Sequence, residues 1–168
     1  LNLIGELCKE ENRKPPLKCN VLFEYQSTFA VFQFSDIDDD INLVWLCNPN
    51  NPDGRIYDID YLKQMIENHP DILFVIDQSY ASFSNYPTLS IREATSYTNV
   101  VLIHSMTKQY AIPGLRLGYI TAHCAVIEKV KRFSMPWSVN TLAIEGGKYL
   151  INNDSEHINV EDYLYESI

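Results

Sequence analysis

From residue 42 onward, short apolar runs alternate with polar stretches along the chain. Four of these runs have the length and the polar boundaries of buried strands. They are NLVWLC (42–47), ILFVI (72–76), NVVLIH (99–104) and LRLGYIT (115–121). Two weaker runs precede them, NVLFEY (20–25) and FAVFQF (29–34), and their partial alternation also predicts short strands.

Helical spacing appears between and after these runs. Ile59, Leu62 and Ile66 lie on one face of a helix that is predicted from about Asp58, which can cap it, to Asn68. Two more helices are predicted downstream. One carries Val126, Ile127 and Val130, and the other starts near Trp137 and carries Val139, Leu142, Ala143 and Leu150. Apolar strands that alternate with helices indicate an α/β fold, with a mostly parallel sheet flanked by helices on both faces.

Polar side chains follow the carboxyl ends of three predicted strands. They are Asn51 after the first strand, Asp77 and Tyr80 after the second, and Ser105, Thr107 and Lys108 after the third. In an open α/β sheet, ligands bind at this edge, so three loops are expected to converge on one small molecule. Taken singly, each of these residues is also typical of an ordinary polar loop.

The chemistry of this set suits one cofactor. An amine such as Lys108 can form a Schiff base with an aldehyde, and a carboxylate such as Asp77 can pair with a protonated ring nitrogen. Hydroxyl groups, together with Arg116 on the adjoining strand, can hold a phosphate. Pyridoxal 5'-phosphate has the aldehyde, the ring nitrogen and the phosphate, and is therefore the expected cofactor.

Three motifs then stand in a familiar order. They are NPNNPDG (48–54), VIDQSY (75–80) and SMTKQYAIPGLRLGY (105–119). With them, residues 42–145 resemble the fold type I pyridoxal-phosphate enzymes, specifically the class I/II aminotransferase family. Two positions depart from the family pattern: Asp53 stands where the family usually has threonine, and Gln78 where it often has glutamate.

The resemblance implies a role for each candidate residue. Lys108 would form the Schiff base and then move a proton at the substrate α-carbon, while Asp77 would keep the ring nitrogen protonated. Asn51 and Tyr80 would hydrogen-bond the phenolic oxygen of the ring. The phosphate would bind to Ser105, Thr107 and Arg116. Lys108, Asp77 and Tyr80 are thus the expected catalytic residues.

The family implies an enzyme that moves the amino group of an amino acid or an amino-alcohol phosphate. TKQYAIPGLRLGY and MPWSVN (135–140) are similar to the L-threonine-O-3-phosphate decarboxylases, of which histidinol-phosphate aminotransferases are near relatives. Decarboxylation is therefore an alternative to transamination. A catalytically silent ligand-binding scaffold is an alternative of another class, although such a protein has little need for Lys108.

Family members run to roughly twice the length of this chain, beyond one average domain. Residues 42–150 are expected to be the latter half of the cofactor-binding large domain, and 151–168 the start of a connection to a small domain. Residues 1–41 match the family poorly. The resemblance implies a homodimer whose active site is completed across the interface, so the chain alone is expected to be inactive.

Composition narrows the possible partners and compartments. The formal net charge of −9 argues against a nucleic-acid partner, and no apolar run approaches the ~18 residues of a membrane span. The four cysteines are scattered, with no Cys/His spacing typical of a metal site. Reduced thiols in a cytoplasmic protein without a metal are the simplest interpretation.

Overall fold

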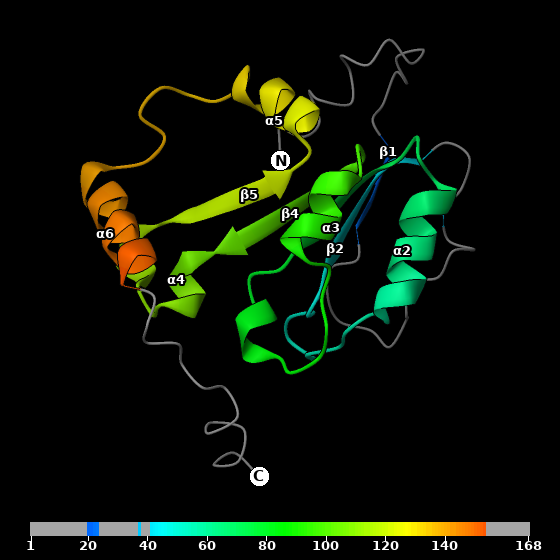
Figure 1. The fold of residues 1–168 in the computed structure, drawn as a ribbon, viewed down its shortest axis with the longest axis horizontal. Helices are drawn as coiled ribbons and strands as arrows, with labels where there is room; N and C mark the ends of the chain where they lie inside the picture. The colour runs from blue at the N-terminus through cyan, green and yellow to red at the C-terminus, as the bar shows by residue number, and fades with distance from the viewer. Residues whose placement is uncertain (1–19, 24–36, 38–40, 154–168) are drawn as a thin grey trace.

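The computed structural model describes residues 20–23, 37 and 41–153, and these include a five-stranded sheet with helices packed against it (Figure 1). The strands are β1 (Asn20–Phe23), β2 (Ile41–Cys47), β3 (Leu73–Asp77), β4 (Val100–Ser105) and β5 (Gly118–Ala122). They lie side by side in chain order, with β1 to β4 parallel and β5 antiparallel to β4. The predicted α/β class with a mostly parallel sheet is confirmed. The predicted strand 29–34 lies outside the described residues.

The helices are α2 (Ile59–Asn68), α3 (Ile91–Ser96), α4 (Met106–Gln109), α5 (Cys124–Lys131) and α6 (Thr141–Asn152). The prediction for α2 is confirmed, and the Asp58 carboxylate caps it by accepting from the N–H groups of Asp60 and Tyr61. α3 and α4 have six and four residues, too few to show an apolar period in the sequence. None of these described helices has the length and apolarity to cross a membrane.

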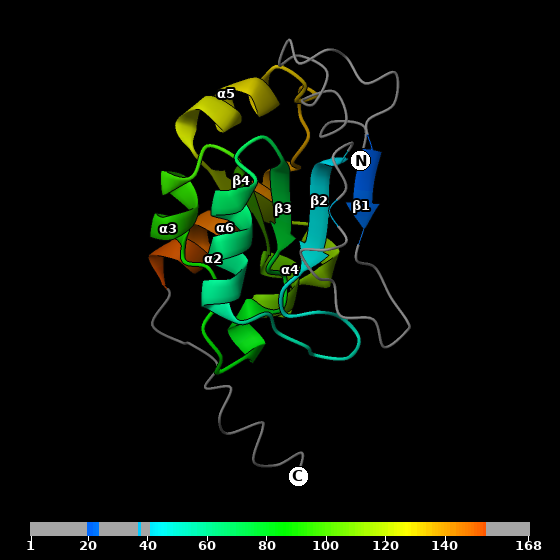
Figure 2. The same ribbon diagram turned by 90° about the vertical axis from the view of Figure 1, so that its right-hand side faces the viewer.

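Both faces of the sheet are covered, as predicted. On one face, Phe74 and Leu102 of the central strands pack with Leu62 and Ile66 of α2. On the other face, alternate residues of the same strands pack against α5. These are Leu43, Val75 and Val101 from the strands with Val126 and Val130 from the helix. Figures 1 and 2 show α2 and α3 side by side and α5 apart from them, beyond the end of β5.

β5 starts later than the last predicted strand, 115–121, and runs antiparallel to β4. Residues 115–117 were expected to be extended, but Leu115 ends a 3₁₀ turn that begins at Pro113. Arg116 then adopts a left-handed conformation, with φ 53° and ψ 53°, which turns the chain. β5 therefore starts at Gly118, opposite Ser105, and runs back along β4. The apolar pattern gives no information about this reversal, because it does not encode backbone handedness.

The last helix, predicted to start near Trp137, begins later in the structure. The helix begins at Thr141, where the Asn140 side chain accepts the N–H of Ala143 at 2.9 Å. Trp137 precedes the helix and is 97% exposed, and Leu142 is 75% exposed. The buried positions are instead small ones, Ala143 and Gly147. A β-carbon on Gly147 would lie 2.7 Å from Leu117 Cδ2, so the missing side chain is what lets the helix approach the chain before β5.

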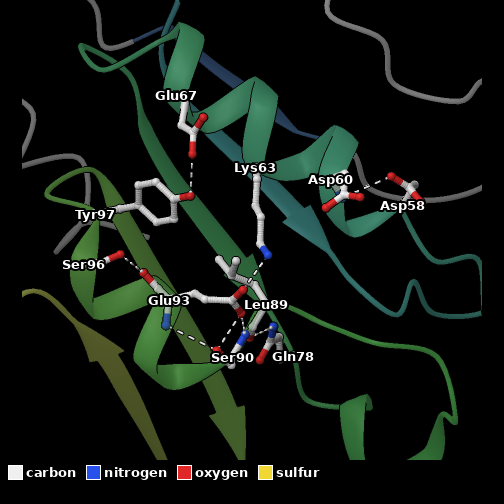
Figure 3. A network of polar contacts seen from close by, with 10 residues as sticks. All are labelled: Asp58, Asp60, Lys63, Glu67, Gln78, Leu89, Ser90, Glu93, Ser96 and Tyr97. Atoms are coloured by element: carbon white, nitrogen blue, oxygen red, sulfur yellow. Dashed lines mark hydrogen bonds and ion pairs between the residues drawn. The ribbon is translucent and has the colours of Figure 1, made fainter.

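A network of polar contacts joins α2 to α3 (Figure 3). Lys63 Nζ on α2 lies 2.5 Å from Glu93 Oε1 on α3, and the Tyr97 hydroxyl donates to Glu67 Oε1 at 2.8 Å. Ser90 and Glu93 form a reciprocal capping box at the start of α3. The bond from Lys63, followed by those from Ser90, lowers the pKa of Glu93 to about 2. Burial, then Glu67, raises the pKa of Tyr97 to about 12. α3 is thus fixed to α2 by charge as well as by apolar contact.

Candidate active site

The carboxyl ends of β2, β3 and β4 are tied together by backbone hydrogen bonds that continue past the strands. The N–H of Asn48 donates to the carbonyl of Asp77 at 2.9 Å, and the N–H of Gln78 donates to the carbonyl of Ile103 at 2.8 Å. The three following loops consequently leave the sheet next to one another. This is the edge at which the sequence predicted the candidate site.

The loop after β2 is held by its own polar side chains. Asn50 Nδ2 donates to Asp53 Oδ1 at 2.8 Å, and the same oxygen accepts the N–H of Arg55 at 3.1 Å. These bonds, the Arg55 N–H first, lower the pKa of Asp53. Asn48 is fully buried, and its Oδ1 accepts the N–H of Tyr57 at 3.0 Å. The loop is closed at its base, and Asn51 is exposed at its tip.

Asn51, Tyr80 and Lys108 meet, although they come from three different loops. Asn51 Nδ2 donates to the Tyr80 hydroxyl at 3.3 Å. Lys108 Nζ lies over the Tyr80 ring, 5.6 Å from its centroid, close enough for a cation–π contact. The structure thus brings these three side chains together. The described residues give Lys108 no ion pair, and its side chain is exposed.

Asp77 is the last residue of β3, and it pairs in register with Cys47 and Ile103 on the strands beside it. Its Oδ1 accepts two hydrogen bonds from Ser79, from the backbone N–H at 2.9 Å and from Oγ at 2.5 Å. Ser79 was not among the predicted site residues. The signal in the sequence was its place two residues after the carboxylate, where a hydroxyl can bond back to it.

The two predicted hydroxyls lie together at the start of α4. Ser105 Oγ and Thr107 Oγ1 are 2.8 Å apart, and Thr107 is buried. Arg116, expected beside them, is exposed, and its Nη1 donates to the carbonyl of Pro113 at 3.1 Å. Within the described part of the chain, Arg116 makes no hydrogen bond to either hydroxyl. Its phosphate role thus stays a prediction.

His104 lies on β4 next to the site, and sequence reasoning gave it no role. Its ring stacks on Tyr119 with centroids 4.5 Å apart, and its Nε2 is buried with no hydrogen-bond partner among the residues the structure describes. Burial lowers the pKa of His104, opposed by the charge of Asp77. The described ranges contain no group of three His, Cys, Asp or Glu side chains that could hold a metal.

The site therefore offers an exposed amine, a hydrogen-bonded carboxylate, a phenol with an amide beside it, and a pair of hydroxyls. A pocket of about 570 Å³ opens beside Asn51 and Tyr80, lined further by residues of the loops after β2 and β3. An amine can attack a carbonyl carbon, and the other groups can orient and charge-match a bound molecule.

Comparisons with known families, sequences and structures identify relatives of this chain. The sequence profile of the family "Aminotransferase class I and II" matches residues 32–163. Histidinol-phosphate aminotransferase 2 of Oceanobacillus iheyensis is 31% identical over 132 residues, which are 76% of this chain and 36% of that protein. The crystal structure of L-threonine-O-3-phosphate decarboxylase from Porphyromonas gingivalis superposes with a TM-score of 0.73 and 36% identity, over 78% of this chain and 41% of that one.

A structure of histidinol-phosphate aminotransferase from Sinorhizobium meliloti, in complex with pyridoxal-5'-phosphate, has a TM-score of 0.63 over 76% of this chain and 34% of that one. Its identity is 20%, so it supports the fold alone. The chain spans between about a third and two fifths of the length of these relatives. The profile match covers more than half of the chain and includes all three motifs. The chain therefore belongs to the class I and II aminotransferase family.

Proposed function

We propose that the protein containing this chain is a pyridoxal-phosphate-dependent aminotransferase that acts on an amino acid or an amino-alcohol phosphate. The observation that carries the proposal is the meeting of Lys108, Tyr80 and Asn51 at the carboxyl edge of the sheet. When bound, pyridoxal phosphate supplies an aldehyde that condenses with amines and a ring that withdraws electrons from the bonds at the substrate α-carbon.

The residues present fit this cofactor on three counts. The Lys108 side chain is exposed and carries no ion pair among the described residues, so its amine is free to react. Asp77 has one oxygen fixed by Ser79, which orients its carboxylate for a ring nitrogen. Ser105 and Thr107 bond only to each other through their side chains in the described structure, and their hydroxyls can turn to a phosphate.

Each residue then has a distinct task. Asp77 would pair with the ring nitrogen of the cofactor and favour its protonated form. Asn51 and Tyr80 would donate to the phenolic oxygen of the ring, and Ser105, Thr107 and Arg116 would bind the phosphate. Lys108 Nζ would serve as the general base that takes the proton from the substrate α-carbon. We also propose that residues 42–150 belong to the latter half of a cofactor-binding domain; the expected connection to a small domain at 151–168 lies, from residue 154 on, outside the described residues.

The test is cofactor binding by the full-length protein. Titration with pyridoxal phosphate should produce a near-visible absorption band, and borohydride should fix the cofactor to Lys108 in a peptide map. Lys108→Ala should lose the band, whereas Lys148→Ala, which removes an exposed lysine of α6, should keep it. A wild-type protein that stays colourless at saturating cofactor would favour a silent ligand-binding scaffold.

Decarboxylation of L-threonine-O-3-phosphate is the second candidate function. It is favoured by the 36% identity and the TM-score of 0.73 to such a decarboxylase, over 78% of this chain. The two reactions differ in the bond that breaks at the α-carbon, so their products separate them. Release of carbon dioxide from the phosphorylated amino acid supports the decarboxylase, and formation of a keto acid supports the aminotransferase.

We further propose a cytoplasmic homodimer for the full-length protein, as the family resemblance implies. Residues 135–151 expose several large apolar side chains, a surface that a second copy would cover. They include Met135, Trp137, Leu142, Tyr149 and Ile151, each between 67% and 97% exposed. Sedimentation equilibrium at micromolar protein should give twice the chain mass, and a monomer would contradict this proposal.

A further inference from the structure

The segment that carries Tyr80 is a loop closed at its base. It leaves β3 at Gln78, makes the short 3₁₀ turn Ala81–Phe83, and returns to Leu89, just before α3. The side chain of Gln78 joins the two ends, since its Nε2 donates to the Leu89 carbonyl at 2.9 Å. Compact loops with adjacent ends depend on such contacts, because few other bonds hold them to the protein.

Gln78 is buried, and both its backbone and its side chain make hydrogen bonds. It is 6% exposed. Its N–H donates to the carbonyl of Ile103 on β4 at 2.8 Å, and its own carbonyl accepts the N–H of Ala81 at 3.0 Å. Its side chain hydrogen-bonds the Leu89 carbonyl and not a group proposed to bind the cofactor.

The far end of the loop is equally fixed. Leu89 is 1% exposed, and it precedes the capping box of Ser90 and Glu93. Glu93 is paired with Lys63 of α2 (Figure 3). The buried Leu89 carbonyl is thus an acceptor attached to α3 and, through the ion pair of Glu93 with Lys63, to α2. The hydrogen bond from Gln78 to this carbonyl therefore anchors the start of the loop, two residues before Tyr80.

We infer that Gln78 is a positioning residue whose neutral amide, bonded to the Leu89 carbonyl, holds Tyr80 against Asn51 and Lys108. The inference rests on the proposed function for its effect on cofactor, although the effect on the loop stands apart from it. In this chain the partner is a carbonyl oxygen, which needs a donor, and an ionised carboxylate has none.

Gln78→Glu turns this requirement into a dependence on pH. The new carboxyl can donate to the Leu89 carbonyl only when protonated, and burial beside a carbonyl favours the protonated form. The titratable groups on the surrounding elements include Lys63 of α2, Glu93 of α3, Asp77 of β3 and His104 of β4. Lys63 and Glu93 neutralise each other, and burial lowers the pKa of His104. Each variant is compared with wild-type protein at the same pH, so that the effect of these groups on cofactor binding, which both proteins share, cancels.

The experiment measures the dissociation constant for pyridoxal phosphate in the full-length protein at about pH 5.5 and about pH 8. Relative to wild type at the same pH, Gln78→Glu should bind within about twofold at the lower pH and about tenfold more weakly at the higher, the scale of one buried hydrogen bond. Gln64→Glu makes the same change at an exposed site of α2 and should match wild type at both. A Gln78→Glu ratio that does not change with pH would overturn the inference.

Two further measurements keep the result unambiguous. Gln78→Met cannot donate at any pH and should weaken binding about tenfold at both, whereas unchanged binding would also overturn the inference. Hydrogen exchange in the cofactor-free protein should show faster exchange at the Ala81 and Phe83 amides of Gln78→Glu at about pH 8, after correction for intrinsic rates. If wild type binds no cofactor, the proposed function fails, and the exchange result still decides the role of Gln78.

Discussion

The ammonium nitrogen of Lys108 lies over the face of the Tyr80 ring, 5.6 Å from the ring centroid. The contact joins the loop after β4 to the loop after β3, and the Tyr80 hydroxyl continues the connection to Asn51 on the loop after β2. Tyr80 thus contacts both of the other loops, one through its ring and the other through its hydroxyl. Because the ring and the hydroxyl have separate partners, substitutions can separate their contributions.

Tyr80→Phe keeps the ring beneath Lys108 and removes the hydroxyl that accepts from Asn51. Affinity for pyridoxal phosphate should fall about three- to tenfold, the value of one ordinary hydrogen bond, with the fold unchanged. Equilibrium titration of the full-length protein measures this change. Tyr86→Phe is the matched control, since Tyr86 lies in the same loop and is 72% exposed. An equal loss in both variants would show that the hydroxyl of Tyr80 has no special role.

Asp77→Asn keeps the shape of the side chain and removes its charge. The ring nitrogen of the cofactor would then lack an anionic partner, so kcat/KM should fall by at least about 100-fold. Ser79→Ala removes only the Oγ bond to Asp77 and should have a smaller effect, about three- to tenfold. Steady-state kinetics on the full-length enzyme compare the two, with Asp71→Asn, at an exposed position just before β3, as a control of equal charge. Near-normal turnover by Asp77→Asn would remove Asp77 from the proposed mechanism.

Gly118→Ala tests the close approach of β5 to β4. A β-carbon at this position would lie 2.7 Å from the carbonyl oxygen of His104, which is backbone and cannot move aside. The free energy of unfolding should fall by about 1–3 kcal/mol, the usual cost of overpacking. Urea denaturation measures it. Gly114→Ala is the control, because nothing lies within 4 Å of the added carbon there. Equal stabilities of the two variants would contradict the pairing of Ser105 with Gly118.

The ion pair between α2 and α3 predicts a contribution to stability that disappears in acid. The folded pKa of Glu93 is about 2, below its ordinary value of 4.5. A carboxyl with a lowered folded pKa stabilises the protein above its unfolded pKa, and this stability is lost as the pH falls from about 4.5 to about 2. Wild-type stability should therefore fall more steeply over that interval than that of Glu93→Gln. Chemical denaturation at several pH values measures both slopes, and parallel curves would exclude the pair as a stabilising contact.

Glu145→Gln is the control for that comparison. Glu145 pairs with Lys148 on the exposed surface of α6, where both side chains are 63% exposed. Exposed pairs of this kind contribute little to stability, so this variant should follow the wild-type curve.

Much of the sheet and the position of the site followed from local sequence. The apolar runs place β2, β3 and β4 to within a residue or two, because each strand is buried on both faces. Asp58 marks the start of α2, because a capping carboxylate acts on the residues next to it. Once the strands are known, their carboxyl ends identify the three loops that carry Asn51, Tyr80 and Lys108.

Other features depend on contacts that sequence spacing does not show. The reversal at Arg116 needs a backbone conformation that arginine rarely adopts, so nothing in LRLGYIT indicated an antiparallel strand. The inward face of α6 is made of small residues, because Leu117 already fills the space. Gln78 drew notice only as a departure from the family pattern, since its partner Leu89 lies eleven residues away and is a backbone carbonyl.

The left-handed backbone conformation at Arg116 creates two opposing selective pressures at this position, one from folding stability and one from phosphate binding. A residue with a β-carbon is strained in this region by about 1–2 kcal/mol, and glycine is not. A mutational scan scored by folded abundance should therefore enrich glycine at position 116. The same scan scored by growth that depends on the enzyme should retain arginine, because only its guanidinium can form the expected bidentate contact with phosphate.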